Sequence, residues 1–153
     1  MTTLTKGLLN KSFAEITDWW SKYKDDQESW GGILKEPSPV LLTTMYAKLV
    51  VEGSIVASKE VIQACHRHLK DLDKQGTDKF SWVFDEDKAY RPIRFIESKC
   101  KPSKGNFDRL VLQPWQHFVV GSMFGWVHKD TGVRRFRESL IFLGRKNGKR
   151  FAV

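Results

Sequence analysis

Cysteine is scarce in this sequence, which has only Cys65 and Cys100 among its 153 residues. So few cysteines argue against a disulfide-stapled scaffold, and both are expected to be free thiols in a reducing cytosol. The sequence also lacks any run of about 18 apolar residues, so it predicts no transmembrane helix. The first residues, "MTTLTKGLLNK", are polar and lack the apolar centre of a signal peptide.

Patterns for metal binding and nucleophilic catalysis are equally sparse. The segment "CHRH" brings together Cys65, His66 and His68, but it lacks the paired CxxC or HxxxH pattern that would support zinc. Cys65 falls on the apolar stripe of a predicted helix, so a core thiol beside surface imidazoles is the preferred interpretation. We therefore predict no metal site. No Ser/His/Asp or Cys/His arrangement has a spacing that supports covalent catalysis.

The composition is that of a globular domain with an excess of basic residues. Apolar residues make up 41% of the chain, and six Trp and ten Phe argue against disorder. The net charge is +8, and residues 128–150 contribute eight basic against two acidic residues. A basic cluster of this kind favours polyanions, either nucleotide phosphates or a nucleic-acid backbone. A solvated face without any ligand explains the charge equally well.

Capping residues and the helical spacing of apolar residues predict four helices. These cover "SPVLLTTMYAKLVVEG", "SKEVIQACHRHLKDLDK", "DEDKAYRPIRFIESK" and "QPWQHFVVGSMFGW". Ser38 and Gly53 are expected to cap the first helix, and Pro92 is expected to kink or split the third. The buried stripes are expected at Leu42, Met45, Tyr46, Leu49 and Val50, at Ile62, Cys65, Leu69 and Leu72, and at Trp115, Phe118, Val119 and Met123.

Two further segments flank these helices. Residues 1–37 are expected to form a short amphipathic helix followed by the Gly/Pro-rich linker "WGGILKEPSP". At the other end, "RRFRESLIFLGR" alternates and then becomes wholly apolar, which predicts a buried strand of a parallel sheet. The expected fold class of this chain is therefore mostly α, with a terminal β-strand or hairpin. Residues 38–153 are expected to form the second unit.

The predicted strand runs into "LGRKNGKR", which approximates a phosphate-binding loop. Such loops have the spacing G-x-x-x-x-G-K-[ST], in which glycine lets the backbone approach phosphate, lysine reaches the outer phosphates and a hydroxyl holds Mg²⁺. Gly148 and Lys149 stand at matching positions, whereas Leu143 takes the first glycine position. Arg150 takes the hydroxyl position and cannot bind Mg²⁺, because guanidinium has no acceptor lone pair. Taken alone, "NGK" is better explained as a turn.

The wider context resembles the large terminase subunit of tailed bacteriophages. That family has a leucine-proline-aromatic-glutamine element about thirty residues before its phosphate-binding loop. Here "LQPWQ" spans Leu112 to Gln116, and "RKNGK" spans Arg145 to Lys149. The upstream segments "YAKLVVEG", "ACHRHLKDL" and "IRFIES" also look like the family's N-terminal helical region. The resemblance covers roughly residues 38–149, and it implies the N-terminal part of an α/β P-loop ATPase.

The resemblance implies roles for single residues and for partners. Gln116 would read the adenine edge, Gly148 and Lys149 would hold the phosphates, and Arg145 would act as an arginine finger supplied in cis. It also implies ATP with Mg²⁺ as cofactors, and double-stranded phage DNA, the small terminase subunit and the portal as partners. The location would be the cytoplasm of a bacterial host, with no membrane association. Arg134, Arg135 and Arg137 are expected to line the strand, with DNA contact a less favoured interpretation.

The departures from the family pattern imply a chain that is inactive alone. Arg150 replaces the Mg²⁺ ligand, and the second ATPase motif, its catalytic glutamate and the nuclease domain are missing from the sequence. An interrupted, frameshifted or trimmed gene would explain this. The alternative is a non-enzymatic basic domain, derived from a terminase, that binds DNA or a packaging complex. Residues 125–153 are expected to be marginally stable or prone to aggregation, because the strand "SLIFLG" lacks parallel neighbours.

Overall fold

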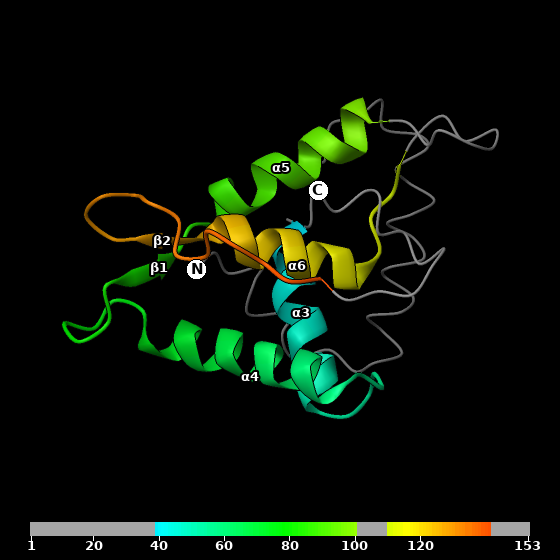
Figure 1. Cartoon of the computed structure of the whole chain (residues 1–153), viewed down its shortest axis with the longest axis horizontal. Helices are drawn as coiled ribbons and strands as arrows, with labels where there is room; N and C mark the ends of the chain where they lie inside the picture. Colours follow the sequence, from blue (N-terminus) through cyan, green and yellow to red (C-terminus); the bar gives the residue numbers. More distant parts are fainter. Residues whose placement is uncertain (1–38, 101–109, 142–153) are drawn as a thin grey trace.

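The computed structural model describes residues 39–100 and 110–141. In these two ranges the chain forms four helices and a two-stranded antiparallel sheet (Figure 1). The elements in chain order are α3 (Pro39–Val51), α4 (Lys59–Lys74), β1 (Trp82–Phe84), α5 (Glu86–Lys99), α6 (Pro114–Gly125) and β2 (Trp126–His128). The predicted class, mostly α with a small amount of β structure, is confirmed. The helix and linker predicted for residues 1–37 lie outside the described residues.

Gly53 ends the first helix as predicted, whereas Ser38, the residue predicted to begin it, lies outside the described residues. Gly53 follows α3 with a φ of 81°, and the Ser54 N–H donates to the Leu49 carbonyl at 2.9 Å. The Ser58 hydroxyl accepts from the first turn of α4, and the Asp85 carboxylate accepts from the Lys88 N–H at the start of α5. Asp85 therefore caps the start of α5.

Pro92 lies inside α5, which continues as one helix from Glu86 to Lys99. Of the two alternatives expected for Pro92, a split of the helix was wrong, and a kink stays a prediction. A proline removes one backbone N–H donor and crowds the preceding turn. Packing compensates here, because α5 buries Ala89 and Ile93 completely against the rest of the core.

The sheet lies elsewhere than the sequence pattern indicated. Trp82 pairs with His128 and Phe84 with Trp126, so β1 and β2 are antiparallel. Both strands are only three residues long, which is too short for alternation to be visible in the sequence. No element was predicted for the residues of β1, and Trp126, the first residue of β2, was expected in the preceding helix.

The buried strand predicted at "RRFRESLIFLGR" is not formed in the part that the structure describes. Arg134 makes one isolated bridge with Val127, and residues 139–141 are not in a strand. Leu140 is 85% exposed, so an apolar residue alone does not place this segment in a core. Residues 142–144 of the predicted strand lie outside the described residues. The expected instability of residues 125–153 stays a prediction.

Helix α6 packs against both α3 and α5, and α3 also packs against α4 (Figure 1). Of the residues predicted to be inward, those fully confirmed as buried are Leu42, Met45, Leu49, Val50, Cys65 and Phe118. The others are partly buried: Tyr46, Ile62, Leu69, Leu72, Trp115, Val119 and Met123. The buried face of α6 is therefore rotated from the predicted one, and it includes Gln116, His117, Val120 and Gly121.

His68 corrects one prediction. We expected a surface imidazole, but His68 is 3% exposed, whereas His66 is exposed as expected. The His68 Nδ1 accepts a hydrogen bond from the Trp126 indole N–H at 3.0 Å. His68 Nε2 lies 3.3 Å from the Thr44 hydroxyl. A polar residue is tolerated on the inner face of α4 because both ring nitrogens have partners.

Candidate nucleotide site at the start of helix α6

The segment "LQPWQ" forms the entry to α6. Leu112 is buried, Gln113 precedes the helix in an extended conformation, and Pro114 is its first residue. Proline suits this position because its fixed φ fits the first turn and its missing N–H would have no helical partner there. The N–H groups of Gln116 and His117 both donate to the Gln113 carbonyl, at 2.9 and 3.0 Å. The motif therefore defines a helix start.

Gln116 is part of this helix start, and its side chain is not on the surface. It is 5% exposed, and its Oε1 accepts a hydrogen bond from the Gln113 N–H at 2.7 Å. An amide oxygen has two lone pairs, so this bond fixes the orientation of the carboxamide without using all of its acceptor capacity. The adenine contact of Gln116 stays a prediction.

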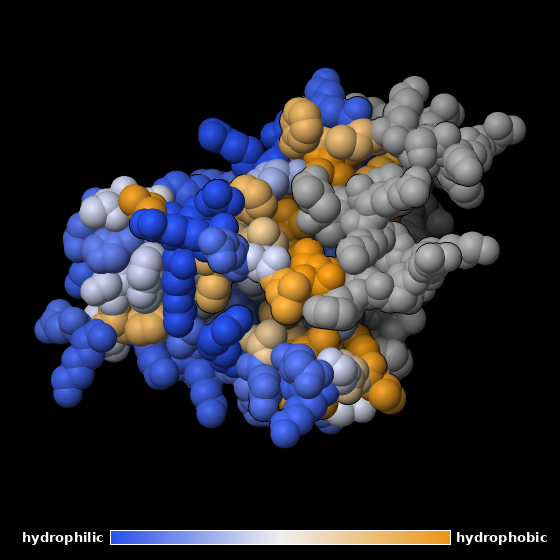
Figure 2. All heavy atoms as spheres, viewed as in Figure 1, coloured by the Kyte–Doolittle hydropathy of each residue, from blue (hydrophilic) through white to orange (hydrophobic). Residues whose placement is uncertain are grey.

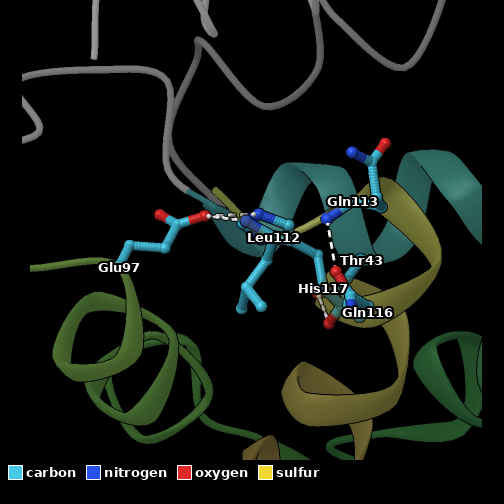
Figure 3. A network of polar contacts seen from close by, with 6 residues as sticks. All are labelled: Thr43, Glu97, Leu112, Gln113, Gln116 and His117. Atoms are coloured by element: carbon cyan, nitrogen blue, oxygen red, sulfur yellow. Dashed lines mark hydrogen bonds and ion pairs between the residues drawn. The ribbon is translucent and has the colours of Figure 1, made fainter. Parts of the chain in front are cut away.

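A carboxylate of α5 holds the same turn from one side (Figure 3). Glu97 Oε1 accepts from the Leu112 N–H at 3.0 Å and lies 3.2 Å from His117 Nε2. Glu97 is 6% exposed and His117 is fully buried. Hydrogen bonds to a charged group contribute about 1.5–3 kcal/mol, so this oxygen links the residues before and after Gln116 firmly.

Helix α3 holds the turn from another side. The Thr43 hydroxyl donates to the His117 carbonyl at 2.9 Å, and Thr43 is fully buried (Figure 3). One turn further along α6, Gly121 packs directly on Thr43, so that any added Cβ would collide with the threonine hydroxyl. The close approach of α3 and α6 at this point depends on the missing side chain of Gly121.

Sequence reasoning found Gln116 but missed Glu97, Thr43 and His117. Glu97 did leave a signal, since Ala89, Ile93 and Glu97 stand at i, i+4 and i+8 along α5. A charged residue on the apolar stripe of an amphipathic helix indicates a buried partner. His117 and Thr43 have no comparable pattern.

The other predicted site residues, Arg145, Gly148 and Lys149, lie outside the described residues. Among the three arginines upstream of them, Arg135 has a defined place. Its guanidinium donates to Asp71 at 2.6 Å and lies over the rings of Phe80 and Trp126, with centroid distances of 5.3 and 5.7 Å. Arg135 therefore links the segment after β2 to α4, and its positive charge is paired with the Asp71 carboxylate.

The outer face of α4 carries a group of accessible basic residues. A shallow surface depression there is lined by Gln63, His66, Arg67, Lys70, Asp71 and Lys74. Hydrophilic residues predominate over α4 and over the end of the molecule that holds the strands (Figure 2). Arg67, Lys70 and Lys74 outnumber the one carboxylate of the lining, that of Asp71, which pairs with both Lys74 and Arg135. The lining therefore has an excess of positive charge.

Other chemistry has little support in the described part of the chain. No group of three or more His, Cys, Asp or Glu residues there is placed to hold a metal ion. Burial raises the pKa of Cys65 to about 12, which keeps this thiol protonated and unreactive. Of the helices in the described ranges, none has the length and apolar character to span a membrane.

Residues 114–153 match the family model "Terminase large subunit, ATPase domain". The match starts at the first residue of α6 and includes Gln116, Arg145 and Lys149. It supports the predicted resemblance to the terminase ATPase for this segment. Neither the curated proteins nor the solved structures include a match to the chain. The terminase-like segment thus begins with a turn that α3 and α5 hold in place.

Proposed function

We propose that this chain is the nucleotide-binding N-terminal part of a bacteriophage terminase large subunit, which drives viral DNA into the prohead with ATP. The observation that supports this most is the family match that starts at Pro114 and extends through the loop "RKNGK". An ATPase-domain match makes ATP the expected ligand. The cofactor Mg²⁺, the small terminase subunit, the portal and a location in the bacterial host cytoplasm follow from the same proposal.

The residue roles are distributed over two segments. Gln116 contacts the adenine, because a carboxamide donates and accepts at once as an adenine edge requires. Gly148 and Lys149 bind the phosphates, and Arg145 stabilises charge on the transferring phosphoryl group.

The test is equilibrium binding of a fluorescent ATP analogue to the full chain, with competition by unlabelled ATP. We expect Lys149→Ala to weaken binding about 10- to 100-fold, as for loss of a hydrogen-bonded charge pair. Lys146→Ala is the matched control, since it removes a lysine of the same loop at one of the variable positions of the spacing G-x-x-x-x-G-K-[ST]. It should change affinity about twofold at most through the general charge effect.

The outcome separates the proposal from its alternative. Equal affinity of the Lys149→Ala and Lys146→Ala variants would contradict the assigned phosphate role. A chain without measurable ATP binding, but with DNA binding that falls steeply with salt, would instead support the non-enzymatic basic domain. In that case Arg67, Lys70 and Lys74 on α4 would be the first residues to replace.

A further inference from the structure

We propose that Glu97 is a positioning residue for nucleotide recognition, which sets the geometry of the Gln116 carboxamide from the neighbouring helix. This inference rests on the proposed function, in which Gln116 contacts the adenine. It concerns α5, which lies outside the segment that matches the family model.

The geometry of the turn supports this role. Glu97 Oε1 contacts one residue on each side of Gln116 in the sequence. It accepts a hydrogen bond from the Leu112 N–H at 3.0 Å and lies 3.2 Å from His117 Nε2. Between these two contacts, the Gln113 N–H donates to Gln116 Oε1 and so orients the Gln116 carboxamide. A shift of Leu112 moves the Gln113 amide with it, since the two residues share a peptide bond. Glu97 therefore controls the donor that orients Gln116 (Figure 3).

Burial explains why one oxygen can exert this control. Glu97, Leu112 and His117 are exposed by 6%, 1% and 0%, so water cannot take over the interactions. A buried N–H that loses its acceptor costs about 1–3 kcal/mol, and the chain would move to recover a partner. Displacement of a recognition group by about 1 Å is enough to impair binding geometry.

The remaining support comes from α3. Thr43 fixes the His117 carbonyl, and this contact is independent of Glu97. With Thr43 in place, loss of Glu97 should loosen the entry to α6 at Leu112 and Gln113 without releasing the helix. We therefore expect an effect on base selectivity larger than that on phosphate binding.

The experiment compares Glu97→Leu with Glu97→Gln in the full chain. Leucine keeps the volume and removes the acceptor, whereas glutamine keeps an oxygen that can accept from the Leu112 N–H. We expect Glu97→Leu to reduce the preference for ATP over GTP roughly fivefold, as loss of one well-oriented hydrogen bond would. The affinity of Glu97→Leu for inorganic triphosphate should stay within about twofold of that of the unmodified chain. Glu97→Gln should keep the preference for ATP over GTP. Glu86→Leu, at an exposed position of the same helix, is the matched control.

A purely structural role predicts a different pattern, with lower stability and unchanged selectivity per folded molecule. Near-ultraviolet circular dichroism confirms folding of each variant before binding is measured. If Gln116→Ala removes the ATP preference but Glu97→Leu does not, the inference about Glu97 fails and the proposed function stands. If the unmodified chain binds no ATP, both fail. The inference is supported if Glu97→Leu reduces the preference for ATP over GTP and the double variant Gln116→Ala/Glu97→Leu shows no larger reduction than Gln116→Ala alone.

Discussion

The His68 side chain extends from α4 to Phe84 and Trp126 of the sheet, and it is neutral in the folded protein. Its Nδ1 accepts from the Trp126 indole, so protonation at that nitrogen would break the bond. Burial lowers the pKa of His68 to about 4, from the 6.5 expected of an exposed histidine. The unfolded chain therefore binds a proton more readily than the folded one, and stability falls as the pH decreases from about 6.5 towards 4.

This gives a prediction for acid unfolding. His68 should account for at most about 3 kcal/mol of lost stability across that pH interval, following 1.36 kcal/mol per pKa unit. Urea unfolding followed by tryptophan fluorescence at pH 7 and at pH 4.5 measures the difference. His68→Gln should flatten the pH dependence, whereas His66→Gln at the exposed neighbouring position should leave it as it is. An unchanged slope in His68→Gln would show that other groups carry the effect.

At the scale of the elements, the sequence predicted the helices well because caps and apolar spacing are local properties. Gly53 ends α3 at the predicted position, with the positive φ that glycine tolerates. The sheet escaped prediction because three-residue strands carry no period, and their pairing comes from residues that are far apart in the chain. The candidate site shows the same division. Gln116 belongs to a sequence motif, whereas Glu97 contacts its neighbours Leu112 and His117 from another helix.

The contact between α3 and α6 yields a prediction whose sign is informative. Alanine in place of glycine normally stabilises a helix by about 1 kcal/mol. Gly121→Ala should instead destabilise the protein by about 1–3 kcal/mol, because its Cβ would displace the buried Thr43 hydroxyl from the His117 carbonyl. Chemical denaturation of the single variants and of Gly121→Ala/Thr43→Ala gives the coupling energy. The double variant should recover much of the loss, and simple additivity would contradict the proposed collision.

At the scale of the whole molecule, the described fold supplies a platform rather than a complete site. Helix α6 is held by α3 and α5, and Arg135 ties the segment after β2 to α4 through Asp71. The terminase-like match then continues through the loop "RKNGK", which lies outside the described residues. In the proposed function the platform presents Gln116, and the loop presents Lys149. In that proposal, Arg150 determines how strongly ATP binding depends on Mg²⁺.

Arg150 stands where phosphate-binding loops have serine or threonine, and guanidinium offers donors only. Unmodified chain should therefore bind ATP with little dependence on Mg²⁺. Arg150→Thr restores an oxygen ligand, and we expect Mg²⁺ to strengthen its ATP binding about tenfold more than it does for the unmodified chain. Titration of the fluorescent ATP analogue with Mg²⁺ and with EDTA measures this difference. Arg150→Ala removes the same charge without adding an oxygen, so an equal gain in that variant would assign the effect to charge and not to metal binding.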